Sequence, residues 1–583
     1  MWQLSFMIKN SSLDPSVDFI EDKHAFVASR LAGIHPNLMI VLASIWLATI
    51  GNIALWQTIS KIPEMNDGRA LWFCLAFAAL IAALLCMLMS LLCWRRTLKP
   101  IIVFLFASAA MGAYFMTSYG VVIDSTMIEN VLQTDTREAL DLFSWKLVLF
   151  FLLLGVLPTV LLIRQEVRAF SWIKTLSNKL VLFAGSCVIA VVAVMPIYQD
   201  FASTMRNHIQ LRYLVNPLNS IYAIGLLSYQ SIAPMQSGRF TLQAIGLDAK
   251  LGPTYTGQPK IPMLILVVGE TARSVNFGIN GYARETTPML RAIKKNTDQI
   301  GELTSQTNAW SCGTSTATSL PCMFSHLDKS AFEANQQNFE NLLDVLTRAG
   351  LAVIWLENQS GCKGICDRNY RDATQKSKDA ELCATGECFD EIMLKNLDQR
   401  FAEVPFDRLS RGIVVVMHQM GSHGPAYYKR SPEKLKQFKP ECRTNVLQDC
   451  SKPEVINAYD NTILYTDYFL SKVIDYLKLK QPEVQAAMMY VSDHGESLGE
   501  NNLYLHGLPY AIAPDVQKHI PWISWFANDF ISRHNLDTDC LAARSDKKLS
   551  HDNYFHTVLG LMDVQTQLYK TELDAYAPCR VKW

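Results

Sequence analysis

The five longest apolar runs of this 583-residue chain have no charged residue in their interior. Proteins that carry solutes across a membrane usually bury ionisable groups within their spans, so this absence disfavours a transporter or a metal sensor. The chain also has no internal repeat and no low-complexity tract. What it has instead is an uneven distribution of hydrophobic residues, which make up half of its composition.

The apolar runs all lie before residue 200, and each approaches or exceeds the roughly 20 residues that cross the core of a bilayer. Buried core helices are the alternative, but they would need amphipathic segments to surround them, and the sequence offers none. We therefore expect a multi-pass α-helical membrane domain with five spans. The spans are predicted at Leu38–Ile59, Leu71–Trp94, Ile101–Ile123, Lys146–Ile163 and Leu180–Tyr198.

Loop charges predict the orientation of these spans. Arg95–Lys99 holds three basic residues and no acid, and residues 164–179 hold four basic residues and one acid. The alternate loops, Lys61–Arg69 and Asp124–Ser144, are balanced or acidic. Because basic loops tend to remain in the cytoplasm, we expect the amino terminus inside and everything after residue 200 outside. The first run begins only at Leu38, so we expect an anchor and not a removable signal peptide.

Cysteine placement points to the same side of the membrane. No Cys-x-x-Cys pair occurs, and the cysteines outside the apolar runs lie in polar surroundings, mostly four to ten residues apart. Such spacing also allows zinc binding, but five disulfides in an oxidising compartment explain it better. The ten cysteines concerned are Cys312, Cys322, Cys362, Cys366, Cys383, Cys388, Cys442, Cys450, Cys540 and Cys579.

The composition changes after the last predicted span. Arg206–Val215 has a helical pattern, and Pro217–Ile232 is apolar but too irregular for a sixth span, which favours a position on the membrane surface. The stretch LGPTYTGQPK marks a linker, and from Ile261 short apolar runs alternate with longer amphipathic segments, as in an α/β domain with a largely parallel sheet. The predicted domains are a cytoplasmic tail (1–36), a five-helix membrane domain (37–200), a bridging helix and linker (201–260) and a soluble domain (261–583).

Four predicted strands of the soluble domain are followed within two residues by side chains that can bind a metal or take part in catalysis. In open α/β sheets ligands bind beyond the carboxyl ends of the strands, so residues more than 200 positions apart should converge on one edge. Ile261–Val268 is followed by Glu270, Ala352–Trp355 by Glu357, Asn358 and Gln359, Ile413–Met417 by His418 and then His423, and Met488–Val491 by Asp493 and His494.

Asp493 and His494 form the sharpest candidate for a metal site. They follow the buried-strand pattern of Ala486–Val491, and a carboxylate beside an imidazole suits a divalent cation such as zinc. His506 follows His494 by twelve residues, beyond a polar loop that could bring it back to the same centre. A helix-capping aspartate and a surface histidine would produce the same pair.

The segment Ala309–Ser325 gathers hydroxyl residues between Cys312 and Cys322. A bridge between these cysteines would close a tight loop and hold Thr314, Ser315 and Thr316 rigidly. A hydroxyl at the start of a short helix can bind or attack a phosphoryl group, and a metal would lower its pKa. A surface loop rich in serine and threonine remains the plainer interpretation.

The outer loop Asp124–Ser144 has a helical composition. Asn130, Thr134 and Glu138 are spaced at i, i+4 and i+8, which places them on one stripe of a continuous helix. Spacing alone favours an ordinary solvated face, but the position of this loop at the outer membrane surface leaves a substrate-binding role open.

Several motifs resemble those of the phosphoethanolamine transferases in the alkaline-phosphatase-like (sulfatase-like) superfamily, which include enzymes that modify lipid A and confer colistin resistance. The resemblance covers nearly the whole chain. The motifs are VVGETAR (Val267–Arg273), NGYARETTP (Asn280–Pro288), CGTSTATSLPCMFS (Cys312–Ser325), HQMGSHGPAYYKR (His418–Arg430) and SDHGESLGE (Ser492–Glu500).

The resemblance implies a role for each candidate residue. Glu270, Thr316, Asp493 and His494 would hold one tightly bound zinc, with Thr316 as the nucleophile. His418, His423 and His506 would handle the phosphate, the leaving group or a possible second zinc. Asn358, Gln359 and Lys363 resemble the headgroup-binding positions, and Asn130, Thr134 and Glu138 match the membrane-proximal substrate helix of the family.

The implied reaction takes phosphoethanolamine from phosphatidylethanolamine and passes it, through a phosphothreonine, to lipid A or another sugar or phosphate of lipopolysaccharide. The enzyme would lie in the bacterial inner membrane with its catalytic domain in the periplasm, and no nucleic acid would be involved. A glycerophosphate transferase or a phosphodiesterase or sulfatase of the same superfamily is the alternative. A sulfatase needs cysteine or serine where this chain has Thr316.

Overall fold

The computed structural model describes residues 33–62, 69–134, 136–236, 241–295, 300–335, 337–384 and 386–581. Most of the tail predicted at 1–36 lies outside the described residues. The described chain forms two compact units. One contains the residues up to Tyr114 together with Lys146–Asn219, and the other contains Phe115–Trp145 together with the residues from Ser220 onwards.

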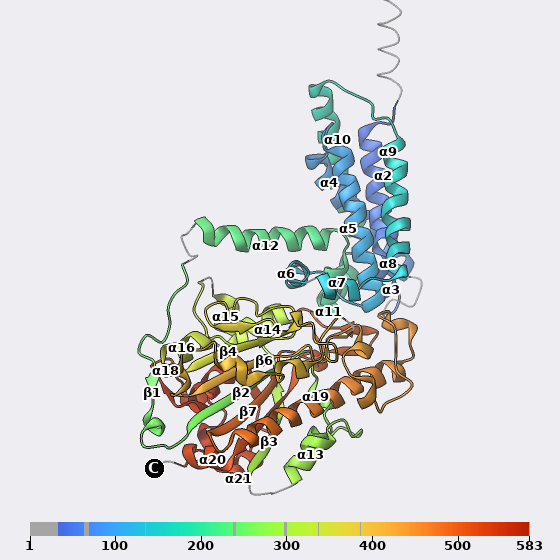
Figure 1. Ribbon diagram of the computed structural model, residues 1–583. Coiled ribbons are helices and arrows are strands. Elements are labelled where there is room, and N and C mark those ends of the chain that lie inside the picture. Colours follow the sequence, from blue (N-terminus) through green and yellow to red (C-terminus); the bar gives the residue numbers. More distant parts are fainter. Residues whose placement is uncertain are drawn as a thin grey trace, which may run out of the picture. The chain divides into compact units, whose positions relative to one another are not determined.

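Helices build the first unit, and α4 packs against both α2 and α10 (Figure 1). Five helical stretches of the described chain are long and apolar enough to cross a bilayer, which confirms the predicted five spans. They are Pro36–Ile59 (α2, Pro36–Thr49, and α3, Ile53–Ile59), Ala70–Leu92 (in α4, Arg69–Leu92), Leu98–Tyr119 (α5), Trp145–Arg164 (α8, Trp145–Phe150, and α9, Leu157–Arg164) and Trp172–Asn207 (α10, Trp172–Val194, and α11, Tyr198–Asn207).

Two details of these spans differ from the expected pattern. The last one begins at Trp172 and not near Leu180, so Lys179 lies on a helix, where its Nζ is 5.8 Å from the centre of the Trp94 ring. The fourth contains a π-helical turn, Phe151–Val156, directly before α9. Pro158 in α9 has no backbone N–H to donate to a carbonyl oxygen in the preceding turn. This missing hydrogen bond explains the π-helical geometry there.

The segment after the last span is helical to a greater extent than its sequence suggests. A 3-10 helix at Ile209–Leu214 follows α11, and then α12 runs without interruption over Leu218–Gln236. α12 is not among the five stretches that could span a membrane. The expectation that Pro217–Ile232 is not a sixth span is therefore confirmed among the described residues.

The outer loop between the third and fourth spans belongs to the second unit. Its first helix, α6 (Ser125–Gln133), begins after Asp124, whose carboxylate accepts a hydrogen bond from Met127 N. Thr134 has an extended backbone (φ −66°, ψ 131°) and separates α6 from α7 (Thr136–Asp141). The prediction of one continuous helix with a single polar stripe is therefore wrong, because the chain turns at the middle residue of that stripe.

An eight-stranded sheet forms the centre of the second unit (Figure 1). Its strands are parallel to their neighbours except for β10, which runs antiparallel to both β3 and β7. This confirms the predicted α/β domain with a largely parallel sheet. The order is β11 (Leu549–Ser550), β3 (Gly301–Trp310), β10 (His519–Ala527), β7 (Val484–Ser492), β2 (Ile261–Gly269), β6 (Ile413–His418), β4 (Ala352–Glu357) and β5 (Tyr370–Asp372).

The four strands that carry candidate site residues are immediate neighbours, in the order β7, β2, β6 and β4. They are buried almost throughout, as their runs of valine, isoleucine, leucine and methionine require. Their register aligns the carboxyl ends: Gly269 pairs with Ser492, and His418 pairs with both Val268 and Glu357. The expected convergence of distant residues on one edge is therefore a direct result of strand order.

Several flanking elements complete the second unit. The long helix α19 (Lys452–Lys480) packs against β7. The predicted linker is attached to the domain, because β1 (Lys250–Leu251) pairs with β12 (Val564–Gln565). The five expected disulfides are all present: Cys312–Cys322, Cys362–Cys366, Cys383–Cys388, Cys442–Cys450 and Cys540–Cys579.

Candidate metal centre

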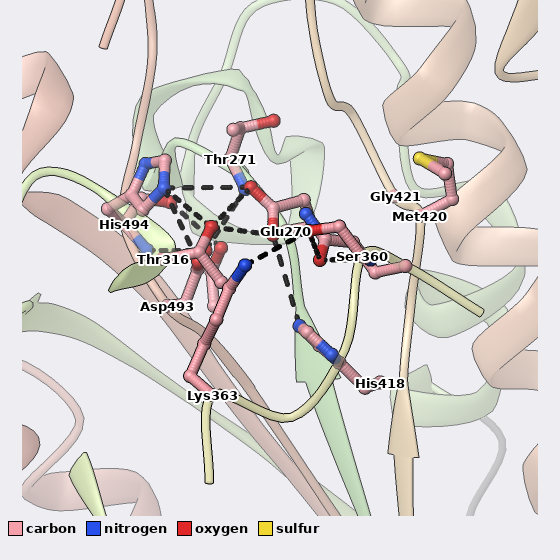
Figure 2. Close-up of polar contacts among 12 residues, drawn as sticks. Glu270, Thr271, Thr316, Ser360, Lys363, His418, Met420, Gly421, Asp493 and His494 are labelled. Atoms are coloured by element: carbon pink, nitrogen blue, oxygen red, sulfur yellow. Dashed lines mark hydrogen bonds and ion pairs between the residues drawn. The ribbon is translucent and has the colours of Figure 1, made fainter. Parts of the chain in front are cut away.

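Three side chains meet beyond the ends of β2 and β7 in a completely buried cluster (Figure 2). One ligand atom from each of Glu270, Asp493 and His494 lies within 4.8 Å of the others. His494 Nε2 is 3.3 Å from Asp493 Oδ2 and 3.6 Å from Glu270 Oε1. These two carboxylates and one imidazole are buried away from water. At these distances their oxygen and nitrogen atoms could bind one cation together.

Thr316 brings a hydroxyl to the same cluster. It is the first residue of helix α14 (Thr316–Met323), inside the ring closed by the Cys312–Cys322 disulfide, and it is only 4% exposed. Its Oγ1 lies 3.0 and 3.2 Å from the two carboxylate oxygens of Glu270 and 3.4 Å from His494 Nε2. The hydroxyl therefore faces the carboxylates at the end of a helix whose first N–H groups have no helical partner.

The hydrogen bonds of the cluster leave its ligand atoms directed inward. His494 Nδ1 lies 2.9 Å from the carbonyl oxygen of Gly495, so that nitrogen carries the proton and Nε2 has the free lone pair. Asp493 Oδ1 accepts hydrogen bonds from Thr271 N and His494 N, whereas its buried Oδ2 has no hydrogen-bond partner in the described chain. Burial lowers the pKa of His494 to about 4, which keeps its imidazole neutral. These residues fit a divalent metal of the zinc type.

A second group with metal-ligand residue types does not offer a comparable site. Cys362, Cys366 and Asp367 lie close together, but the two cysteines are joined in a disulfide. Their sulfurs are therefore not thiolates that could bind a metal. Among the described residues, the cluster of Glu270, Asp493 and His494 is the metal candidate that remains.

Two of the three predicted outer histidines join the cluster in a row of rings. The ring centres of His494 and His506 are 4.4 Å apart, and those of His506 and His423 are 5.6 Å apart. His506 Nδ1 lies 3.3 Å from a carboxylate oxygen of the fully buried Glu496. The loop after β7 thus returns to the centre, as predicted for His506.

His418 lies on the opposite side of Glu270 from His494 (Figure 2). It is fully buried, with Nε2 3.9 Å from Glu270 Oε2 and Nδ1 3.0 Å from Glu357 Oε1. Burial alone would raise the pKa of Glu357, but His418 and the N–H groups of Trp355 and Gln359 outweigh burial and lower it. His418 therefore pairs with an ionised Glu357, while its Nε2 faces Glu270 without a hydrogen bond to it in the described chain.

The predicted headgroup residues lie in the turn after β4. Asn358 is buried, and its Nδ2 donates to Cys388 O and to Asp390 Oδ1. Gln359 is buried as well, and its Oε1 accepts from Ser360. Lys363 Nζ lies 3.3 Å from Ser360 Oγ, on the side of the cluster that holds Thr316 (Figure 2). Ser360 was not predicted as a site residue, although it lies within the same NQSGCKG stretch.

The membrane-proximal stripe is only partly described. Asn130 lies on α6 and Thr134 ends it, with Thr134 Oγ1 donating to Asn130 O at 2.8 Å. The side chain of Glu138 lies outside the described residues. The turn at Thr134 changes which residues of this segment share a face, and its substrate-binding role stays a prediction.

Asp390 is a residue that the sequence did not single out. Its buried carboxylate accepts hydrogen bonds from Asn358 Nδ2 and from the backbone N–H groups of Met420 and Gly421, at 2.8 to 3.2 Å. Gly421 lies against Glu270: a Cβ there would come within 2.9 Å of Glu270 O. Asp390 therefore ties the turn after β4 to the turn after β6 that supports Glu270. Its signal in the sequence is weak, because it follows no strand.

Asp390→Asn should reduce the free energy of unfolding by about 1–3 kcal/mol, because an amide NH₂ would replace an oxygen that accepts from N–H donors. Urea unfolding of the full chain in detergent measures the change. Glu391→Gln is the matched control, since Glu391 is the neighbouring acid and contacts Tyr465 and not the two turns. Equal effects of the two substitutions would contradict the proposed role of Asp390.

Removal of metal with a chelator should lower the melting temperature of the full chain, and added zinc should restore it. The physical reason is that Glu270 and Asp493 repel each other in a buried site when no cation is bound; zinc at 100 times its Kd would stabilise the fold by about 2.7 kcal/mol. Asp493→Asn should abolish the zinc-dependent rise. A rise that persists in that variant would place the metal elsewhere.

Comparison with protein-family models gives two matches in separate parts of the chain. The model for phosphoethanolamine transferase EptA/EptB matches residues 81–231, and the sulfatase model matches residues 262–564. The first covers part of the membrane-spanning half, and the second covers the α/β domain with the metal candidate.

Known proteins resemble the chain over nearly its whole length. It is 36% identical to phosphoethanolamine transferase EptA of Salmonella typhimurium over 93% of this chain and 96% of that one. It is 34% identical to phosphatidylethanolamine transferase Mcr-1 of Escherichia coli, over 92% of this chain and 96% of that one. The structure of the integral membrane lipooligosaccharide phosphoethanolamine transferase A from Neisseria meningitidis superposes on this chain with a TM-score of 0.87 at 35% identity. The match covers 94% of this chain and 99% of that one. The chain therefore belongs to the phosphoethanolamine transferases, as a multi-pass membrane enzyme with a sulfatase-like soluble domain.

Proposed function

We propose that this enzyme transfers phosphoethanolamine from phosphatidylethanolamine to lipid A, or to another sugar or phosphate of lipopolysaccharide, through a covalent phosphothreonine at Thr316. The observation that carries the proposal is the position of Thr316 Oγ1, 3.0 Å from Glu270 and 3.4 Å from His494 at the amino end of α14. A buried hydroxyl in contact with a cluster of metal-ligand type is the arrangement that a phosphoryl-transfer nucleophile requires.

The names of the relatives support the choice of substrates. The matching Neisseria meningitidis structure is a lipooligosaccharide phosphoethanolamine transferase, and a more distant Escherichia coli relative, 27% identical, is a Kdo(2)-lipid A phosphoethanolamine 7''-transferase. Both names describe a lipid-linked saccharide as acceptor. We extend that acceptor class to this chain, because its length matches both relatives and its fold matches the Neisseria meningitidis structure.

The residues that would hold the metal are Glu270, Thr316, Asp493 and His494, with zinc as the ion that suits their oxygen and nitrogen donors. When bound, zinc would lower the pKa of a coordinated hydroxyl and offset negative charge on the phosphoryl oxygens. His423 and His506 are the residues that would hold a second, more weakly bound zinc beside the first.

In the first step Thr316 Oγ1 gives its proton to the Glu270 carboxylate, 3.0 Å away, and forms a bond to the phosphorus of the donor, while the bond from phosphorus to the glycerol oxygen breaks. His423 and His506 are the candidate acids that protonate the departing diacylglycerol oxygen. In the second step an acceptor oxygen attacks the phosphorus and gives its proton to the histidine that lost one in the first step, while the bond from phosphorus to Thr316 Oγ1 breaks and this oxygen takes its proton back from Glu270. The backbone N–H groups at the start of α14 would face the phosphoryl oxygens in both steps.

The remaining predicted residues would bind the donor lipid. Lys363 offers a cation beside Ser360, and Asn358 and Gln359 shape the turn that carries both. Asn130, Thr134 and Glu138 would meet the lipid at the membrane surface.

We place the enzyme in the bacterial inner membrane, with the second unit in the periplasm. The basic loops at Arg95–Lys99 and residues 164–179 support this orientation. The five disulfides of the soluble half suit an oxidising compartment. Donor and acceptor would then both reach the catalytic domain from the outer leaflet.

Thr316→Ala should reduce transfer by a factor of about 10³ or more, because it removes the atom that bonds to phosphorus. Mass spectrometry of lipopolysaccharide from cells that express each variant measures the added phosphoethanolamine and maps it to its sugar. Thr316→Ser is the matched control and should retain a measurable part of the activity, since it keeps the hydroxyl. An alanine variant that folds and transfers at the wild-type rate would rule out this nucleophile.

A further inference from the structure

The segment of α6 and α7 is attached to the catalytic unit at the carboxyl end of each helix. Lys363 Nζ lies 3.4 Å from the carbonyl oxygen of Gln133, the last residue of α6. Asp141, the last residue of α7, pairs with Arg430 through Oδ2 at 2.6 Å, and Lys429 contacts its other oxygen. One cation therefore meets the carbonyl end of α6, and two cations meet the side-chain carboxylate of the residue that ends α7.

The pair between Asp141 and Arg430 is buried, unlike an ordinary surface salt bridge. The side chain of Asp141 is 4% exposed and that of Arg430 is 2% exposed. An exposed pair contributes little, whereas the loss of one partner from a buried pair leaves the other charge uncompensated. The contact therefore holds α7 in place more strongly than its short length suggests.

The same guanidinium also holds the loop that carries a predicted catalytic histidine. Arg430 Nε donates to the backbone carbonyl oxygen of His423 at 2.8 Å, and Nη1 pairs with Glu387. All three contacts use different N–H groups of one planar fork, which is a geometry that lysine cannot provide. Arg430 thus connects α7, the His423 loop and the turn closed by Cys383–Cys388.

We infer that Arg430 is a positioning residue that fixes the α6–α7 segment relative to His423, with Asp141 as its partner on that segment. The inference rests on the proposed function, in which Asn130 and Thr134 meet the donor lipid. Its consequence is that the lipid-contacting segment and the acid–base histidine are held in one arrangement by one side chain. Loss of Asp141 should release the segment while leaving the bond between Arg430 and His423 in place.

The test compares a lipid donor with a soluble one, using the full chain in lipid nanodiscs. With phosphatidylethanolamine, Asp141→Asn should raise KM about ten-fold or more and change kcat little, since the buried charged contact that orients the segment is lost. With p-nitrophenyl phosphoethanolamine, which needs no lipid-binding segment, hydrolysis by the same variant should stay within about two-fold of wild type. Arg430→Gln should lower kcat for both substrates, because it also frees His423.

Asp407→Asn is the matched control. Asp407 forms an exposed ion pair with Arg411 in the same unit, and this pair includes no residue of α7. The control substitution should change neither substrate's kinetics. The double variant Asp141→Asn with Arg430→Gln should lower kcat no further than Arg430→Gln alone. An unchanged KM for the lipid donor in Asp141→Asn, or an equal loss with both substrates, would overturn the inference.

Hydrogen exchange separates this inference from the proposed function. Asp141→Asn should accelerate exchange of the amides of residues 125–141 and leave those of the core strands unchanged. If the wild-type enzyme transfers no phosphoethanolamine, the proposed function fails, but the exchange measurement still tests the contact. Unchanged exchange in residues 125–141 would overturn the role of the pair whatever the substrate.

Discussion

The repulsion between two buried carboxylates is the constraint on which the centre of this enzyme depends. Glu270 and Asp493 follow adjacent parallel strands, so the sheet itself forces them together with no water to separate their charges. Neutral His494 and the Thr316 hydroxyl fill the remaining sides of the cluster. In the proposed mechanism a divalent cation would resolve the repulsion and would also lower the pKa of the Thr316 hydroxyl.

The parts of the site that could be predicted are those that follow strands. A buried run ending in an acid or a histidine locates a side chain at the edge of a parallel sheet, and strand order alone then brings Glu270, His418 and Asp493 together. The start of α14 was predictable for a similar reason, since Cys312 and Cys322 constrain a short hydroxyl-rich loop. The five spans follow from length and hydrophobicity.

The parts that could not be predicted depend on contacts between segments far apart in the chain. Nothing near Asp390 indicates that it accepts hydrogen bonds from two turns more than 25 residues away. The pair between Asp141 and Arg430 joins positions separated by 289 residues. Helical spacing also misled for the stripe at Asn130, Thr134 and Glu138, because Thr134 adopts an extended backbone that periodicity does not reveal.

We propose that a metal bound among Glu270, Asp493 and His494 meets the Thr316 hydroxyl. Anomalous diffraction at the zinc absorption edge, from crystals of the full chain grown with zinc, tests it most directly. We expect a strong peak within bonding distance, about 2.0–2.2 Å, of oxygen or nitrogen atoms from these residues and Thr316. A peak bound by other residues, with none at this cluster, would contradict it.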